Sequence, residues 1–275
     1  MGKIVTFTGG LGAQILSCSA YFFLQQLDGI CYSDMSYFNL TQESGRMSSG
    51  VSLWDWELSE FGIPLSTFRP HDDVSNKGHL EVLDDANIKK LEFAYAGLQT
   101  PSVRNLFLIP DLVKAKCREL LGDKPYACIH IRRGDYLRVA DYLVSDRSFS
   151  LIIQGLSRVI PHIVIVTDSP LSQEFQNFQE RKVADVNITP IVGGNSFLSH
   201  AIMRMSSILV CSNSQYSYTA ACLMETGSLS LFPKQYLGES RSSEELHDFF
   251  AGQSDFMVIN NKSSREISRD EVIIF

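Results

Sequence analysis

Residues 128–137, CIHIRRGDYL, join a buried strand to a cluster of charged side chains. The apolar run over residues 126–131 is typical of a strand in the interior of a sheet. The polar side chains at its end are His130, Arg132, Arg133 and Asp135. Charged groups are costly to bury without partners. The stretch therefore predicts either an anion-binding site or a structural ion pair at the carboxyl end of a strand.

Strands alternate with helices on both sides of this stretch. Strands are expected at residues 3–8, 126–131, 162–167, 208–212 and 229–232, and helices at 14–27, 82–95, 110–121, 149–160, 197–205 and 216–225. A further helix is expected to begin at Pro170, and residues 33–80 are expected to form loops with short helices. This alternation predicts an α/β protein with parallel sheets that are covered by helices. A turn-like stretch at 122–125 divides it into domains 1–122 and 123–275.

Composition and charge exclude several classes of protein. The chain has 275 residues, 44% of them hydrophobic, and a net charge of -7, which argues against a general nucleic-acid binder. Its six cysteines are scattered without metal-binding spacing, so we expect buried free thiols in a reducing cytosol. The first residues, MGKIVTFTGG, are typical of a strand and a loop, so we expect no signal peptide, and no apolar run reaches about 20 residues. We therefore expect a cytoplasmic protein, with peripheral membrane contact left open.

Three polar clusters follow three of the predicted strands. They are the cluster at 130–135, Thr167-Asp168-Ser169, and residues 212–217 (SNSQYS) just before a helix. Ligands bind at the carboxyl ends of the strands in open α/β sheets, and helix N-termini favour anions. An arginine opposite such a helix clamps a phosphate in bidentate fashion. Together the clusters predict a pocket for a diphosphate-bearing ligand.

Each cluster alone has a structural explanation. The arginines could form a surface turn with a local ion pair, and SNS is an ordinary helix cap. His130 could be a satisfied core histidine, and Gly9-Gly10-Leu11-Gly12 could be a tight turn, since it lacks the spacing of a dinucleotide fingerprint. The joint occurrence of the clusters, in order and each at a strand end, favours a site.

The motifs resemble those of the bacterial α-1,2-fucosyltransferases of glycosyltransferase family 11. The glycine loop, with Gly10, Gly12 and Gln14, is similar to the family's G-G-L-G-N-Q. Residues 130–136 (HIRRGDY) are similar to its hallmark H-x-R-R-G-D-Y, the most specific of the set. Residues 166–169 and 212–217 resemble its second and third motifs, and the likeness spans most of the chain.

The resemblance implies a GT-B-like fold, in which a cleft separates two Rossmann-like domains. It also implies inverting transfer of L-fucose from GDP-fucose to a galactoside or lipid-linked glycan of surface polysaccharide, without a metal or other cofactor. The expected catalytic residues are Arg132, Arg133 and Asp135, and the expected donor-binding residues are His130, Arg132, Asp168, Ser212, Asn213, Ser214 and Gln215. Arg132 is the first candidate for catalysis, because negative charge grows on the leaving diphosphate and a cation stabilises it. Arg133 either assists it or pairs with Asp135.

Two positions depart from the family pattern and keep alternatives open. Ala13 replaces the usual Asn of the glycine motif, and Ser199 stands where an Asp is thought to recognise guanine. Two alternatives therefore stay open. One is a transferase that uses another donor, such as GDP-colitose, and the other is an inactive relative that binds a glycan or a nucleotide. The Arg133-Gly134-Asp135 triplet also matches an adhesion motif, which fits less well in a chain without an export signal.

The general base and the acceptor are the least specified parts. Asp135 and Asp141 are candidate bases, and a reaction with little base assistance is the other option. Residues 33–80 are expected to shape the acceptor side, and their candidate residues are Trp54, Trp56, His71, Asp72 and Asp73. The tryptophans could equally be packing residues.

Overall fold

The computed structural model describes residues 2–28, 31–38, 54–70, 80–85, 87–138, 144, 146–173, 176, 186–225, 228–234 and 256–260. The chain forms two compact units, residues 1–111 and 112–275. The sequence places the boundary slightly later, at 122/123, after the helix α5 (Asp111–Leu121).

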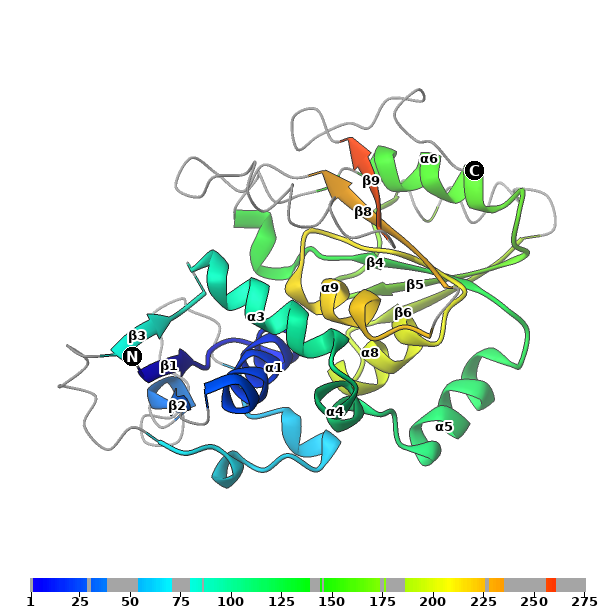
Figure 1. The fold of residues 1–275 in the computed structure, drawn as a ribbon. Coiled ribbons are helices and arrows are strands. Elements are labelled where there is room, and N and C mark those ends of the chain that lie inside the picture. Colours follow the sequence, from blue (N-terminus) through cyan, green and yellow to red (C-terminus); the bar gives the residue numbers. More distant parts are fainter. Residues whose placement is uncertain are drawn as a thin grey trace. The chain divides into compact units, whose positions relative to one another are not determined.

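The first unit is built on a three-stranded parallel sheet (Figure 1). Its strand order is β2 (Cys31–Asp34), β1 (Gly2–Thr6), β3 (Leu80–Leu83), with β1 paired in parallel to both neighbours. The helices α1 (Leu11–Asp28) and α3 (Ile88–Gln99) pack on each other, and they come directly after β1 and β3 in the chain. This is the strand, loop and helix order that the sequence predicts.

Short helices and an aromatic cluster complete this unit. The short helices are η1 (Leu58–Phe61), η2 (Leu65–Thr67), α4 (Pro101–Arg104) and η4 (Asn105–Phe107). The aromatic cluster brings together the rings of Phe7, Tyr21, Phe38, Trp56 and Phe68, with Phe7 and Phe68 centroids 4.6 Å apart. Trp56 is thus a packing residue, and its Nε1 donates to the carbonyl of Ile63 at 2.9 Å.

Three details of the first unit differ from the sequence prediction. The helix predicted over 82–95 begins only at Ile88, because residues 80–83 form β3. Residues 33 and 34, which the sequence predicts as loop, belong to the strand β2. Helix α1 begins at Leu11, so Gly12 belongs to its first turn and not to the preceding loop.

The second unit is built on a six-stranded parallel sheet. In sheet order its strands are β6 (Asn187–Val192), β5 (His162–Thr167), β4 (Ala127–Ile131), β7 (Ile208–Val210), β8 (Leu229–Lys234) and β9 (Phe256–Asn260). In the described residues this unit also contains α5, apart from its first residue, and η5 (Gly134–Arg138), α6 (Asp146–Leu156), α8 (Ser196–Arg204) and α9 (Gln215–Cys222). The α/β class with parallel sheets is therefore confirmed. The cleft between the domains stays a prediction.

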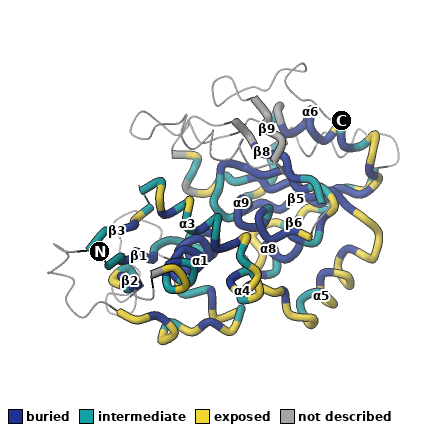
Figure 2. Tube along the Cα trace, in the orientation of Figure 1, coloured by how far each residue is buried: buried dark blue, intermediate teal, exposed yellow. Residues whose placement is uncertain are grey.

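The two faces of β4 contact different helices. Ala127, Ile129 and Ile131 belong to a buried cluster with the apolar side chains of α6. Tyr126 and His130 point to the opposite face, where the Tyr126 hydroxyl donates to the Ile202 carbonyl in α8 at 2.7 Å. This alternation follows from the period of two residues in a strand. Figure 2 shows β4 and β5 as buried throughout.

The strand order creates a topological switch point between β4 and β7. The chain proceeds from β4 outward to β5 and β6 on one side, and then returns to place β7, β8 and β9 on the other side. At such a point the connections leave β4 and β7 in opposite directions, and the diverging loops leave room for a ligand. The predicted polar clusters of residues 130–135 and 212–217 follow these two strands.

Two further observations concern the whole described chain. All six cysteines are buried and unpaired, as the sequence predicts. In the described part of the chain, no helix combines the length and apolarity that a membrane crossing requires. The helix expected to begin at Pro170 does not begin there, because residues 170–172 are not helical and Gln173 is the first helical residue; most of the rest of this segment lies outside the described ranges.

Candidate functional site: the carboxyl edge of the six-stranded sheet

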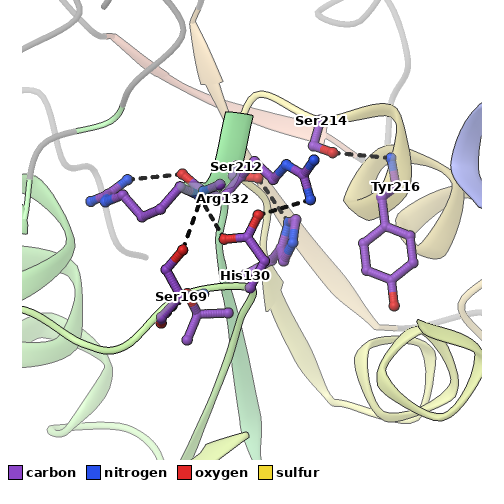
Figure 3. Close-up of polar contacts among 10 residues, drawn as sticks. His130, Arg132, Ser169, Ser212, Ser214 and Tyr216 are labelled. Carbon is purple, nitrogen blue, oxygen red and sulfur yellow. Dashed lines mark hydrogen bonds and ion pairs between the residues drawn. The ribbon is translucent and has the colours of Figure 1, made fainter. Parts of the chain in front are cut away.

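His130 and Ser212 link the two strands at the switch point. The Ser212 hydroxyl lies 2.7 Å from His130 Nδ1, and both side chains are buried (Figure 3). The ring of Tyr216, in the first turn of α9, lies 5.3 Å from the His130 ring and 5.4 Å from the ring of His200 in α8. The expected site residues His130 and Ser212 are therefore brought together, on the face of the sheet that carries α8 and α9.

Both histidines of this cluster are neutral near pH 7. Burial, and then the nearby Arg132 charge, lower the pKa of His130 to about 3. Burial also lowers the pKa of His200 well below its usual value, with the charge of Arg204 adding to the effect. His200 Nε2 shares a hydrogen bond of 3.2 Å with Thr219 Oγ1. Neutral imidazoles can orient a ligand or a neighbouring group, but they add no positive charge to the site.

Arg132 lies beside Asp168, which follows the neighbouring strand β5. Its Nη1 is 2.8 Å from Asp168 Oδ2, and its guanidinium lies 5.3 Å from the centre of the Tyr136 ring. The other carboxylate oxygen of Asp168 accepts the backbone N–H of Arg133 at 2.8 Å. Asp168 thus braces the loop after β4 and fixes the direction of Arg132.

Arg133 faces the other side of the sheet. It forms an ion pair with Asp146 in the first turn of α6, and its guanidinium lies 5.7 Å from the Phe149 ring centre. Its Nη1 also donates to the Arg132 carbonyl at 3.0 Å. Because neighbouring residues of an extended chain point to opposite faces, only one of two adjacent arginines can face α8 and α9. These contacts give Arg133 a structural partner, Asp146, that sequence reasoning missed.

Gly134 is required by the position of Asp168. Its φ is +28°, and a Cβ at this residue would lie 2.6 Å from Asp168 Oδ2. Its backbone N–H donates to Ser169 Oγ at 3.3 Å, a contact that Figure 3 shows. The glycine of the Arg-Arg-Gly-Asp motif therefore lets the loop approach the residues after β5 closely.

The loop between β7 and α9 presents a buried amide. Asn213 is 7% exposed, and among the residues that the structure describes its Nδ2 has no hydrogen-bond partner. Ser214 caps α9, since its Oγ accepts the N–H of Tyr216 at 3.3 Å. Gln215 is the first residue of this helix. Buried amide donors are nearly always paired in folded proteins, so Asn213 is a candidate ligand contact.

The glycine-loop residues lie in the first unit, and Gln14 has a structural role there. It is fully buried, and its Nε2 donates to the carbonyls of Gly9 and Asp55 at 2.9 and 2.8 Å. Its Oε1 accepts the N–H of Glu57 at 2.9 Å. Gln14 therefore fastens the glycine loop to residues 54–57. Gly10 packs against the ring of Trp54.

Other expected site residues cannot be placed. The backbone of Asp135 lies in η5, but its side chain is outside the described part, as are Asp141, His71, Asp72 and Asp73. Ser199 is described and buried, next to His200 in α8. Within the described ranges, no group of three or more His, Cys, Asp or Glu side chains is close enough to hold a metal ion.

Comparisons with known proteins give remote structural similarity only. No protein-family model matches the chain, and no curated protein matches it. Similar solved structures include POFUT1 in complex with GDP, at 11% identity and a TM-score of 0.48, covering 84% of this chain and 98% of that one. POFUT1 in complex with GDP-fucose has 11% identity and a TM-score of 0.47, with 84% and 97% covered.

A third similar structure is NodZ α-1,6-fucosyltransferase soaked with GDP-fucose, at 11% identity and a TM-score of 0.41. The match covers 82% of this chain and 93% of that one. Membership of glycosyltransferase family 11 stays a prediction from the motifs.

Proposed function

We propose that this protein is an inverting fucosyltransferase that uses GDP-fucose as donor and a galactose-containing glycan as acceptor, with an α-1,2 linkage. The observation that carries the proposal is the pair Arg132 and Asn213 on the two sides of the switch point. The strands β4 and β7 are neighbouring and parallel, so Arg132, which follows β4, and Asn213, which follows β7, leave the sheet at the same edge. A cationic donor and a buried amide donor at one sheet edge suit the oxygens of a diphosphate.

The reaction is a single displacement. An acceptor hydroxyl attacks the anomeric carbon while the nucleoside diphosphate leaves from the opposite face, and negative charge grows on the β-phosphate. Arg132 stabilises this charge, because its guanidinium carries a permanent positive charge in a planar fork of N–H groups that matches phosphate oxygens, and Asp168 fixes its direction through the 2.8 Å contact with Nη1. One charge-assisted hydrogen bond contributes about 1.5–3 kcal/mol. Arg132→Ala is therefore expected to weaken donor binding by roughly ten- to a hundred-fold.

The neighbouring residues hold this arrangement in place. Asp168 orients Arg132, and the neutral His130, hydrogen-bonded to Ser212, contacts the nucleoside or supports the arginine. The first turn of α9, capped by Ser214 and starting with Gln215, presents its positive dipole end to the phosphates. We assign Arg133 a supporting role in the loop, through its ion pair with Asp146, in place of the direct catalytic role that the motif implies.

Asp135 is the proposed general base, with Asp141 as the competing residue. A carboxylate that accepts the acceptor's proton gives a rate that rises with pH through its pKa. Asp135→Asn is expected to abolish this rise. A variant that retains the full rate at every pH would remove Asp135 from the role.

The reaction is proposed to need no metal, because Arg132 can supply the charge that Mg²⁺ supplies at other diphosphates and the chain contains no D-x-D motif. The acceptor is a lipid-linked glycan precursor of surface polysaccharide, which would bring the protein to the inner face of the membrane. The remaining choice concerns the nucleotide, since Ser199 cannot pair with guanine as a carboxylate does.

The direct test is product formation from GDP-fucose and lactose-type galactosides in the presence of EDTA. Mass spectrometry detects the transferred deoxyhexose, and NMR of the product gives the linkage and the anomeric configuration. The proposal predicts an α-1,2-fucoside, and strongly reduced product with Arg132→Ala. Transfer only from another nucleotide sugar would keep the site and replace the donor. Absence of transfer with every donor and galactoside would contradict the proposal.

A further inference from the structure

The hydrogen bond between Ser212 and His130 allows two positions of the imidazole proton. Ser212 Oγ and His130 Nδ1 lie 2.7 Å apart, and a dashed line joins them in Figure 3. A neutral imidazole has one N–H donor and one acceptor nitrogen, whereas a hydroxyl can both donate and accept. If Ser212 donates to Nδ1, the ring proton lies on Nε2. If Nδ1 donates to Ser212, Nε2 is an acceptor.

The proton of the Ser212 hydroxyl decides between these two forms. Among the residues that the structure describes, Ser212 Oγ has no hydrogen-bond partner besides His130 Nδ1, and Ser212 is only 3% exposed. A proton on Nδ1 would leave the hydroxyl proton buried without an acceptor, which is unfavourable. Donation from Ser212 to Nδ1 pairs both groups. His130 is therefore the tautomer that carries its proton on Nε2.

The neighbouring histidine obeys the same rule with a different partner. His200 Nε2 lies 3.2 Å from Thr219 Oγ1, and Thr219 donates its hydroxyl proton to the carbonyl of Tyr216 at 3.0 Å. A hydroxyl has one proton, so Thr219 must accept from His200, and His200 carries its proton on Nε2. The N–H of His200 thus has a partner inside the protein. For Nε2 of His130, the described part of the chain supplies no hydrogen-bond partner.

The N–H of His130 lies at the switch point, where a second donor is also unpaired. Asn213 Nδ2 is buried without a partner among the described residues, and it follows the strand β7 that pairs with the strand of His130. Buried polar groups are nearly always paired in folded proteins. Two uncharged N–H donors at one sheet edge therefore indicate a ligand with acceptor oxygens.

We infer that Ser212 is a positioning residue that fixes His130 as the Nε2–H tautomer, so that His130 is a neutral hydrogen-bond donor to the ligand and not a general base. The acceptor is an oxygen of the bound nucleotide, a statement that rests on the proposed function. With Nε2 protonated and Nδ1 bonded to Ser212, the ring has no lone pair for a substrate proton. A pKa of about 3 keeps it uncharged near pH 7. Ser212 then acts through His130, in place of the direct donor contact that the motif implies.

The test is a long-range ¹H–¹⁵N NMR correlation of the histidine side chains at pH 7, on the full chain labelled with ¹⁵N-histidine. Protonated and unprotonated ring nitrogens have well-separated ¹⁵N shifts, and His130→Asn identifies the His130 signals by their loss. We expect the His130 proton on Nε2. In Ser212→Ala both nitrogens should shift toward the average of the two tautomers, and GDP affinity should fall by up to about tenfold. Ser212→Thr keeps the hydroxyl and should restore both properties.

The matched control is Ser206→Ala, at the other end of β7. Ser206 is 1% exposed, and its hydroxyl donates to the carbonyl of Met203 at 2.7 Å. This variant loses a buried hydroxyl of the same size that does not contact His130, so it should leave the His130 tautomer unchanged. His200, which should also carry its proton on Nε2, is an internal check in the same spectrum.

GDP is then titrated into the labelled protein, which separates the role of Ser212 from the proposed function. A His130 proton on Nδ1, or a tautomer that Ser212→Ala leaves unchanged, would overturn the inference whether or not GDP binds. GDP binding that does not shift the Nε2 signal of His130 would also overturn it and leave the transferase proposal intact. The expected tautomer and its dependence on Ser212, in a protein that binds no nucleotide, would support the role of Ser212 and contradict the transferase.

Discussion

Replacing Gly134 by alanine is expected to damage the donor site while leaving the fold intact. The new Cβ would lie 2.6 Å from Asp168 Oδ2, so the Asp168 side chain must move. Asp168 would then lose its 2.8 Å contacts with Arg132 Nη1 and with the Arg133 N–H. A hydrogen bond to a charged group contributes about 1.5–3 kcal/mol, and tenfold in affinity corresponds to about 1.4 kcal/mol. The affinity for GDP should therefore fall by about ten- to a hundred-fold.

The control for this substitution is Gly122→Ala. Gly122 also has a positive φ, +78°, but nothing lies within 4 Å of a Cβ built there. A left-handed conformation costs an L residue about 1–2 kcal/mol, so both variants should lose stability of that order in chemical denaturation. Only Gly134→Ala should lose GDP affinity in calorimetry. Unchanged GDP binding by a folded Gly134→Ala protein would refute the view that Asp168 organises the donor site.

Three further predictions follow from the buried polar groups. Arg133→Ala should lower the free energy of unfolding by about 1–3 kcal/mol in chemical denaturation, because Asp146 loses its partner. A loss of GDP affinity comparable to that of Arg132→Ala would instead indicate that Arg133 contacts the donor directly. The folded-state pKa of His130, about 3, lies below the unfolded value near 6.5, so the free energy of unfolding should fall as the pH drops from 6.5 toward 3. His130→Asn should reduce the number of protons taken up on unfolding in this range by up to one, which flattens the slope. An unchanged slope would contradict the burial of a neutral imidazole. Gln14→Ala should lower the free energy of unfolding by about 2–4 kcal/mol in thermal or chemical denaturation, because it leaves three backbone partners unpaired. A loss below about 1 kcal/mol would argue against the view that Gln14 holds the glycine loop against residues 54–57.

The parts of the fold that the sequence predicts are those with both faces buried. The strands β4 and β5 are continuous apolar runs, because helices cover both sides of the sheet. The strand β6 was missed, since its side chains are largely exposed and it contains Pro190. Proline is tolerated there because β6 is an edge strand. The strand β2 is four residues long and ends in Ser33 and Asp34, so its pattern is too short to identify.

The sequence located the polar clusters at the strand ends but not the contacts that their side chains make. Polar residues at strand ends could be located, because the ends of predicted strands are visible as changes from apolar to polar sequence. The partner of Arg133 could not, since Asp146 is 13 residues away and meets it only when α6 packs on the sheet. The ion pair of Lys90 with Asp85 was missed for a similar reason: a lysine on a helical segment is normally solvated. Such contacts depend on how the elements pack.

The proposed function requires the carboxyl edge of the six-stranded sheet to bind a nucleoside diphosphate through Arg132. The most direct measurement is calorimetric titration of the full chain with GDP, UDP, CDP and GDP-fucose, with Arg132→Ala in parallel. The account predicts selective binding of GDP and GDP-fucose that weakens roughly ten- to a hundred-fold in the variant. Binding that is equally strong without Arg132, or absent for every nucleotide, would contradict it.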